Sequence, residues 1–410
     1  MLRRPTLLAL CLLALLTGCR PLGPAPAGTG EPEAGVWFVQ ATDPHLFYDS
    51  VTESWKEPVR LFQEKKNQEA LSQLLGILDR PPGTDVRPSF LVVSGDFGLD
   101  RFTDELQAAL GSRAPAAAPA SGEAASASAA SAVRYLVGVL SQSPVKDIFV
   151  VPGNNDVGDE APDGKPVEAM RLFWRRVQQG LGAGVTVRDL TSCYFGEPSE
   201  ACAYDVPGTS YRLVGFPSQS FKNKGKIGED RLRVQMDQLE RLAGLVAQAA
   251  RSGKRVLVVT HIAEVDDPFA LARNELSPPA EPEWVAGRPA WSASSPWNVS
   301  AAVFAHWKEI VDSPAVAGVL AGHFHDSHKE IYRRPYTWST APAGRASLDK
   351  LYLAPPLSLR YQDTSPVQAR GFALFHLRGN DAPERTLFWY DYRTGTFERE
   401  DRLALAGSAP

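Results

Sequence analysis

The sequence predicts an α/β fold in which buried strands are covered by helices. Short apolar runs recur along the chain, and longer stretches with helical periodicity lie between them. Strands that are apolar on both faces require helices packed against their sheet. Polar segments of a few recurring residue types directly follow several of these runs. Ligands of α/β proteins bind at the carboxyl ends of the strands, so these segments are the first place to look for function.

The predicted strands are short runs of β-branched, aromatic and other apolar residues. In chain order they are 36–42 (VWFVQAT), 90–94 (FLVVS), 148–151 (IFVV), 211–216 (YRLVGF), 256–260 (VLVVT) and 316–321 (VAGVLA). Apolar residues spaced by three or four positions predict helices at 57–79, 134–140, 167–179 and 230–251. Two late runs, 371–377 and 386–392, are expected to be strands that close a second sheet.

Two segments show neither the spacing of a helix nor the apolar run of a strand. Residues 113–132 are almost entirely Ala, Ser, Pro and Gly, which predicts a surface loop; the alternative is an alanine-rich helix, which Pro115 and Pro119 disfavour. Residues 264–299 form an insertion rich in Pro and Trp. A long loop of this kind is either an active-site cover or a packed surface loop whose tryptophans are buried. Residues 35–400 would then form one domain, followed by a tail at 401–410.

The N-terminus resembles a bacterial lipoprotein signal peptide. Arg3 and Arg4 precede an apolar run at 7–16, which is too short to span a bilayer, and the run leads into Leu-Thr-Gly-Cys19. In proteins with this motif the cysteine is acylated and the chain is cleaved before it. The alternative is an ordinary secretory signal in which Cys19 is incidental.

The lipoprotein interpretation divides the start of the chain into two segments. Residues 1–18 would be removed, and residues 19–34, rich in Pro, Gly and Ala, would form a flexible tether. The protein would then be lipid-anchored in the bacterial cell envelope. Arg20, in place of an aspartate, favours the outer membrane if the envelope is Gram-negative.

Cysteine usage fits an exported protein. Once Cys11 is removed and Cys19 is acylated, only Cys193 and Cys202 remain. In an oxidising compartment they most simply form a disulfide; two buried thiols are the alternative.

Composition and charge are those of an ordinary soluble domain. Hydrophobic residues make up 44% of the chain and charged residues 22%, and the formal net charge is -4. This balance lacks the excess of basic residues that is typical of nucleic-acid-binding proteins. Because a weakly negative protein does not attract anions, recognition of a phosphate would depend on local charge or on a metal.

Five segments that follow predicted strands carry metal-ligand residue types. They are Asp43-Pro44-His45, Gly95-Asp96, Gly153-Asn154-Asn155-Asp156, His261 and Gly322-His323-Phe324-His325. Carboxylate, amide and imidazole groups together bind hard-to-borderline divalent cations. Each segment alone has a simpler explanation: a helix N-cap for Asp43, a turn residue for Asn154, solvated imidazoles for His323 and His325. Explanations of this kind would have to hold for all five segments at once.

The order D-x-H, G-D, G-N-x-D, H and G-H-x-H resembles the calcineurin-like metallophosphoesterase superfamily. The resemblance spans Asp43 to His325 and implies a four-layer α/β/β/α sandwich with two mixed sheets. It also implies two divalent metal ions, which Mn, Fe, Zn, Mg or Co would all satisfy. Asp96 would bridge the ions. The other ligands of one ion would be Asp43, His45 and His325, and those of the second Asn154, His261 and His323.

The implied activity is hydrolysis of a phosphoester or phosphoanhydride by a metal-bridging hydroxide. The resemblance places Asn155, Asp156, His261 and His323 in the catalytic set. The expected substrate is a phosphorylated small molecule, polyphosphate or lipid. Weaker candidates for phosphate contacts, which are otherwise surface charges, are Arg101, Arg360-Tyr361 and Arg370.

The chain departs from the family at Asn155, where G-N-H-D/E is usual. An amide donates a hydrogen bond but does not deliver a proton, which favours weakly basic leaving groups such as those of anhydrides and aryl esters. The string G-N-N-D resembles the endopolyphosphatase branch, near the acid-sphingomyelinase-like phosphodiesterases, whose lipid or nucleotide diesters are an alternative. His328 is either a substitute proton donor or a solvated side chain. The departure also leaves open a non-catalytic binding or scaffold lipoprotein.

Overall fold

The computed structural model describes most of the chain from Gly35 onward. The described residues are 35–47, 57–111, 128–157, 164–218, 229–262, 284–285, 288–289, 301–323, 325, 329–333, 350–358, 369–391 and 394–400. The predicted signal peptide, Cys19, the tether, His328, Arg360-Tyr361 and the C-terminal tail lie outside them.

The first sheet has seven strands in the order β14-β13-β12-β1-β2-β3-β4. Its parallel half consists of β1 (Val36–Thr42), β2 (Phe90–Ser94), β3 (Asp147–Val151) and β4 (Thr186–Asp189). Its antiparallel half consists of β12 (Gly371–Leu377), β13 (Glu384–Asp391) and β14 (Thr396–Arg399). The aligned register of β1, β2 and β3, in which Thr42 pairs with Ser94 and Ser94 with Val151, brings their carboxyl ends to one edge.

The second sheet has five strands in the order β11-β10-β7-β6-β5. They are β5 (Ala203–Asp205), β6 (Tyr211–Gly215), β7 (Arg255–Val259), β10 (Val316–Ala321) and β11 (Leu351–Leu353). All pairs are parallel except β5 with β6. Within the predicted insertion 264–299, the structure describes only the two-residue strands β8 (Trp284–Val285) and β9 (Arg288–Pro289), which pair with each other.

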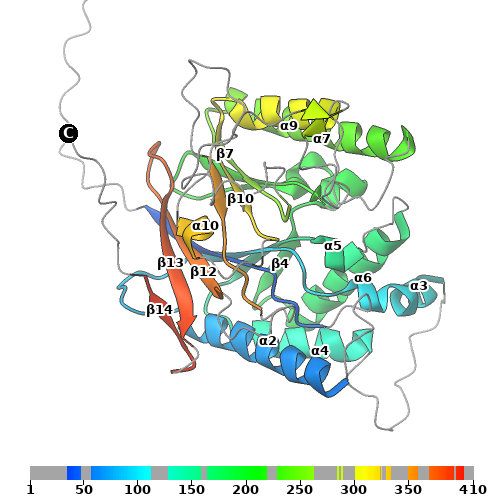
Figure 1. The fold of residues 1–410 in the computed structure, drawn as a ribbon, viewed down its shortest axis with the longest axis vertical. Helices are drawn as coiled ribbons and strands as arrows, with labels where there is room; N and C mark the ends of the chain where they lie inside the picture. Colours follow the sequence, from blue (N-terminus) through cyan, green and yellow to red (C-terminus); the bar gives the residue numbers. More distant parts are fainter. Residues whose placement is uncertain are drawn as a thin grey trace, which may run out of the picture. The chain divides into compact units, whose positions relative to one another are not determined.

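Helices cover the outer faces of the two sheets (Figure 1). On the side of the first sheet lie α2 (Glu57–Ile77), η2 (Asp100–Phe102), α3 (Thr103–Gly111), α4 (Ala129–Leu140) and α6 (Gly164–Leu181). On the side of the second lie α7 (Glu229–Arg251) and α9 (Ala301–Asp312). The remaining short helices are α5 (Asn154–Val157), η3 (Ser192–Phe195), η4 (Ser199–Cys202) and α10 (Glu330–Arg333).

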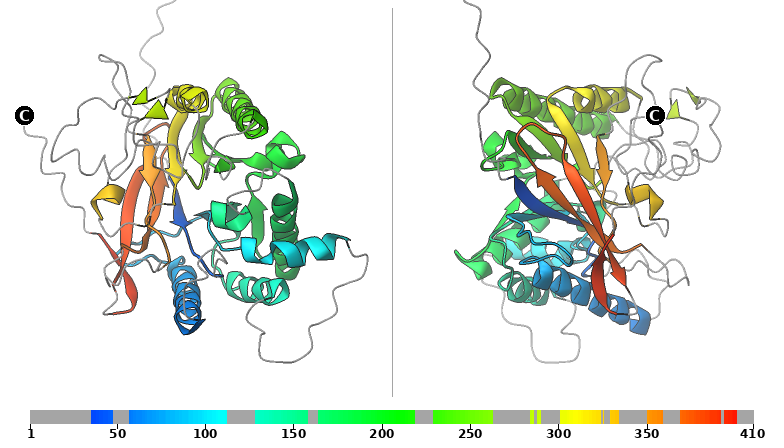
Figure 2. Two further views of the ribbon diagram at one scale, coloured as in Figure 1. Left: turned by 45° about the vertical axis from the view of Figure 1, so that its right-hand side comes forward. Right: turned by 90° about the vertical axis from the view of Figure 1, so that its left-hand side faces the viewer.

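Two apolar cores separate these layers. Phe38 and Val92, on the inner face of the first sheet, belong to a core with Leu257 of the second sheet and with residues of α7 and α9. Their neighbours along the strands, Val39 and Leu91, belong to the other core, with α2, α4 and α6. This period-two alternation places the first sheet between its helices and the second sheet. The predicted two-sheet α/β sandwich is therefore confirmed (Figure 2).

Two expectations about individual segments are wrong. The late strands β12 and β13 extend the first sheet, where Leu377 pairs with Val36 of β1, and do not close the second. An apolar pattern shows that a strand is buried, but it does not show which strand lies beside it, because the backbone hydrogen bonds that join two strands are common to all residues. The predicted loop 113–132 also ends early: Ser128 caps α4 by accepting the Ser131 N–H, and Ala129 and Ala132 are buried.

Cys193 and Cys202 form a disulfide between η3 and η4, with 5.5 Å between their Cα atoms. Both residues are fully buried in the core between the sheets and α7. Among the described helices, none has the length and apolar character needed to cross a membrane.

Candidate metal centre

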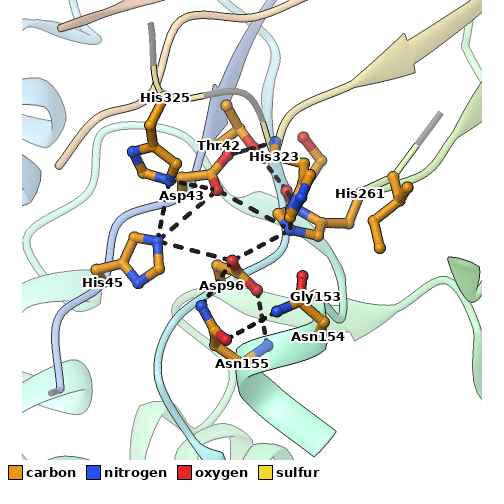
Figure 3. Close-up of polar contacts among 12 residues, drawn as sticks. Thr42, Asp43, His45, Asp96, Gly153, Asn154, Asn155, His261, His323 and His325 are labelled. Carbon is orange, nitrogen blue, oxygen red and sulfur yellow. Dashed lines mark hydrogen bonds and ion pairs between the residues drawn. The ribbon is translucent and has the colours of Figure 1, made fainter. Parts of the chain in front are cut away.

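The candidate ligands lie at the carboxyl ends of five strands from both sheets. Asp43 and His45 follow β1, Asp96 follows β2, Asn154 begins α5 after β3, His261 follows β7, and His323 and His325 follow β10. Because the inner strands of each sheet are parallel, their ends meet at one edge of the sandwich. Figure 3 shows these side chains converging there.

One group of ligand atoms surrounds Asp43 Oδ1. His325 Nε2 lies 3.0 Å from this oxygen and 3.2 Å from His45 Nε2. His45 Nε2 itself lies 3.8 Å from Asp43 Oδ1. Ligand atoms of these three residues all lie within 4.8 Å of one another, so one cation could contact all three.

A second group surrounds the Nε2 atom of His261. This nitrogen lies 3.0 Å from His323 Nδ1, 3.2 Å from Asp96 Oδ2 and 3.9 Å from Asp43 Oδ1. The two groups share Asp43, and Asp96 Oδ2 also lies 3.6 Å from His45 Nε2. Both carboxylates therefore lie between the groups, whereas the sequence assigned the shared position to Asp96 alone.

The donor set fits divalent cations. Imidazole nitrogens of two histidine pairs face each other at hydrogen-bond distance, and carboxylate oxygens face the same points. Asp43, Asp96 and His261 are fully buried, and His323 is 7% exposed. Buried lone pairs that converge without a cation are costly, and a metal between them relieves that cost.

The backbone at this edge adopts a conformation that non-glycine residues avoid. Among the described residues, the positive φ angles outside glycine belong to Asp43 (51°), His45 (39°), Asp96 (54°) and His323 (74°). A left-handed conformation of this kind costs of order 1–3 kcal/mol per residue, and such residues cluster at functional sites. All four are candidate ligands, which supports a functional reason for their placement.

Hydrogen bonds hold the ligands in position. Thr42 Oγ1 lies 2.6 Å from both Asp43 Oδ2 and the Ser94 carbonyl, and the His323 N–H donates to Asp43 Oδ2 at 2.7 Å. His261 Nδ1 lies 2.8 Å from the same Ser94 carbonyl, which leaves Nε2 directed at the centre. Such bonds to the far side of a ligand orient it toward a metal.

Asp156 binds the backbone beside the centre. Its Oδ1 accepts the N–H groups of residues 97–99 at 2.8, 3.0 and 3.3 Å, and its Oδ2 accepts the Gly153 N–H at 2.9 Å. This clamp joins the loop that follows Asp96 to the turn that carries Asn154. Burial and the nearby Asp96 charge outweigh these bonds and raise the pKa of Asp156 to about 7.

Asn155 also faces protein groups. Its Nδ2 donates to Asp96 Oδ2 at 3.0 Å, and its Oδ1 accepts from Asn154 Nδ2 at 2.7 Å. The amide donor of Asn155, which the resemblance placed in the catalytic set, thus contacts Asp96.

The carboxylates and His261 stabilise one another's charged forms in the absence of metal. Burial raises the pKa of Asp43, but the imidazoles of His261 and His325 outweigh it, so that this pKa lies well below its ordinary value. The pKa of Asp96 is likewise low, because His261 and His45 outweigh its burial. Burial lowers the pKa of His261, but Asp96 and Asp43 raise it to about 9. A cation binding here would displace a proton from His261.

Two of the arginines named as weaker phosphate contacts interact with protein groups. Arg101 forms a part-buried ion pair with Glu64 at 2.8 Å. Arg370 is buried, donates from Nε to the Leu357 carbonyl and stacks 4.9 Å from the ring centre of Tyr390.

Two supporting residues were not recognised in the sequence. Thr42 directly precedes Asp43, so its position beside the D-x-H motif was an available signal. Asn67 of α2 donates to the His45 carbonyl at 3.0 Å, and nothing in a helical segment distinguishes this asparagine from a solvated one.

Comparisons with known proteins add little to this geometry. No protein family matches the chain, and no curated protein matches it. The crystal structure of TT1561 of Thermus thermophilus aligns with 90% of this chain and 99% of that chain, at 10% sequence identity and a TM-score of 0.37. A likeness this weak says nothing about function, which is inferred below from the site alone.

Proposed function

We propose that this protein is a two-metal phosphoesterase of the calcineurin-like metallophosphoesterase superfamily. The observation that carries the proposal is the convergence of Asp43, Asp96 and four imidazoles from four strand ends. A binding or scaffold protein with this fold would have no need for two adjoining groups of buried and half-buried ligands, four of which have strained backbones.

The chemistry of the donor set suits phosphate hydrolysis. Two divalent cations held about 3.5–4 Å apart lower the pKa of bound water toward about 7 and neutralise charge on a phosphoryl group. Asp43, His45 and His325 would hold one cation. The ligands of the other would include His261 and His323, with Asn154 on the same side and both carboxylates between the two cations.

The protein's own residues would hold the substrate and exclude water. The buried imidazoles of His261 and His323 line the side of the centre opposite His45 (Figure 3). Position 155 carries an amide, which supplies no proton to a leaving group. The proposed substrates are therefore phosphoanhydrides, including polyphosphate, and esters with weakly basic leaving groups. A lipid or nucleotide phosphodiester is the second substrate class.

A substrate panel tests the activity. The purified protein would be loaded with Mn²⁺ and assayed with an aryl phosphomonoester, an aryl phosphodiester, polyphosphate, a nucleotide diphosphate ester and a sphingomyelin analogue. Metal-dependent turnover that is greatest on the anhydrides or aryl esters supports the proposal. Tight binding of two Mn²⁺ ions without turnover on any substrate would favour the non-catalytic binding protein.

We also propose that a lipid on Cys19 anchors the protein in the bacterial cell envelope. The support is the sequence motif, because Cys19 lies outside the described residues. Cys19→Ala should move the protein from the membrane fraction to the soluble fraction of the host. A variant that remains in the membrane fraction would contradict the lipoprotein interpretation.

A further inference from the structure

Asn155 makes two parallel hydrogen bonds to the Asp96 carboxylate. Its backbone N–H donates to Oδ1 at 2.9 Å, and its side-chain Nδ2 donates to Oδ2 at 3.0 Å. Asn155 is 6% exposed and Asp96 is fully buried, so water does not compete strongly for these bonds. Two donors from one residue fix the plane of the carboxylate, while Oδ2 still faces His261 at 3.2 Å.

The other end of the same amide orients Asn154. Asn155 Oδ1 accepts a hydrogen bond from Asn154 Nδ2 at 2.7 Å. The oxygen and nitrogen of an amide project from opposite sides of its carbon, so this bond turns Asn154 Oδ1 away from Asn155. Figure 3 shows that oxygen on the side of His261. Only the oxygen of an amide binds a hard cation, and the orientation of Asn154 therefore determines whether it is a ligand.

The backbone at Gly153 allows the start of α5 to lie close to Asp96. A Cβ atom at Gly153 would lie 2.1 Å from Asp96 Oδ1, so only glycine lets the first turn of α5 come this close. The Asp156 clamp holds the same turn against the loop after Asp96. The amide of Asn155 is thus placed between two candidate ligands by contacts that do not involve its own side chain.

We propose that Asn155 is a positioning residue of the metal centre: its amide fixes the Asp96 carboxylate and turns the oxygen of Asn154 toward the cation beside His261. The proposal rests on the proposed function, because the centre it organises is the two-metal site. Asn155, which stands where the family usually has histidine, would then help to build the centre. This role does not depend on any contact with substrate.

The test is metal binding, measured apart from activity. Mn²⁺ would be titrated by calorimetry into the purified wild-type protein, Asn155→Ala, Asn154→Ala and the double variant. Loss of an outer group that orients ligands weakens metal affinity about 10–100-fold. In Asn155→Ala we expect a loss of this size for the ion beside His261, and a smaller loss for the other ion, because the Asp96 carboxylate lies between the two groups of ligand atoms. In the Asn154→Ala background the further loss should be smaller, because one of the two groups that Asn155 orients is already missing.

Controls separate this role from a general defect. Asn380→Ala removes an amide from an exposed turn and should leave both affinities unchanged. The melting temperature of metal-free Asn155→Ala should stay close to that of the wild type; if that variant does not fold, Asn155→Ser replaces it.

The outcomes are distinct. Unchanged affinities for both ions in Asn155→Ala, or full additivity with Asn154→Ala, would overturn the positioning role and leave the proposed function standing. Failure of the wild-type protein itself to bind Mn²⁺ would overturn both.

Discussion

Gly95 is the position where a single methyl group tests the geometry of the centre most directly. It lies between Ser94 and Asp96 and has a φ of +88°. A Cβ atom built there would lie 2.3 Å from Nδ1 of His261. Gly95→Ala therefore introduces a steric conflict at the ring that links the second sheet to the first.

The size of the effect follows from these distances. Ordinary contact begins at 3.4 Å, so the His261 ring must retreat by about 1 Å. That movement strains or breaks the 2.8 Å bond from Nδ1 to the Ser94 carbonyl. Overpacking costs about 1–3 kcal/mol, and the left-handed backbone adds about 1–2 kcal/mol for alanine. A displacement of about 1 Å at a site that positions reacting groups lowers the rate about 100-fold.

Gly196→Ala is the matched control. Gly196 has a φ of +101°, but no atom lies within 4 Å of its added Cβ. This variant should show the backbone cost alone, about 1–2 kcal/mol. Chemical unfolding of both variants, with and without Mn²⁺, measures the difference. We expect Gly95→Ala to be the less stable variant and to lose most of the stabilisation by Mn²⁺, whereas Gly196→Ala retains it.

Wild-type Mn²⁺ affinity and turnover in Gly95→Ala would refute the reasoning. Such a result would mean that the His261 ring does not lie against Gly95, and that the second group of ligand atoms is arranged differently.

The remaining predictions concern the shared carboxylate, the disulfide and the carboxyl group of Asp189, whose Oδ2 atom is buried. Asp96→Ala should abolish both the binding of the two ions, measured by calorimetry, and turnover, measured by kinetics. Near-normal turnover would contradict the role of Asp96 as a ligand between the two groups. Replacing both Cys193 and Cys202 with Ala should lower the free energy of unfolding by about 2–3 kcal/mol, because the disulfide closes a loop with a sequence separation of 9; an unchanged unfolding curve would contradict this. Burial raises the pKa of Asp189 despite its bonds from Thr191, so the native state loses stability as pH rises from the unfolded pKa, near the ordinary value of 3.8, through the folded pKa. Asp189→Asn cannot ionise, so its melting temperature relative to the wild type should increase as the pH rises above the ordinary aspartate pKa of 3.8; parallel profiles of melting temperature against pH would contradict the raised pKa of Asp189.

Local pattern predicted the elements that are long or strongly apolar. The strands at Phe90–Ser94, Val316–Ala321 and Gly371–Leu377 have the predicted bounds, and α7 begins within one residue of its prediction. The short strand β4, whose residues Thr186–Asp189 are half-buried or exposed, has no apolar run and was missed. Periodicity reports burial, and where burial is partial the signal is weak.

The candidate site was predictable as a set of residues and not as an arrangement. The residue types of Asp43, Asp96 and His261 after apolar runs were sufficient to propose ligands. Their distances were not predictable, and neither was the position of Asp43 in both groups of ligand atoms. Nor does the sequence show that the amide of Asn155 contacts Asp96, because that depends on how the turn after β3 packs against the loop after β2.

The sequence by itself determined that strands and helices alternate, and that ligand-type residues follow the strands. Both features depend only on residues that are near one another in the sequence. Only the tertiary structure decided which strands are neighbours. It placed β12 against β1 and brought His261 and His323 of one sheet to Asp43 and Asp96 of the other. The physical reason is that backbone hydrogen bonds join any two strands alike, so the selection of neighbours comes from how the apolar faces of whole layers pack together.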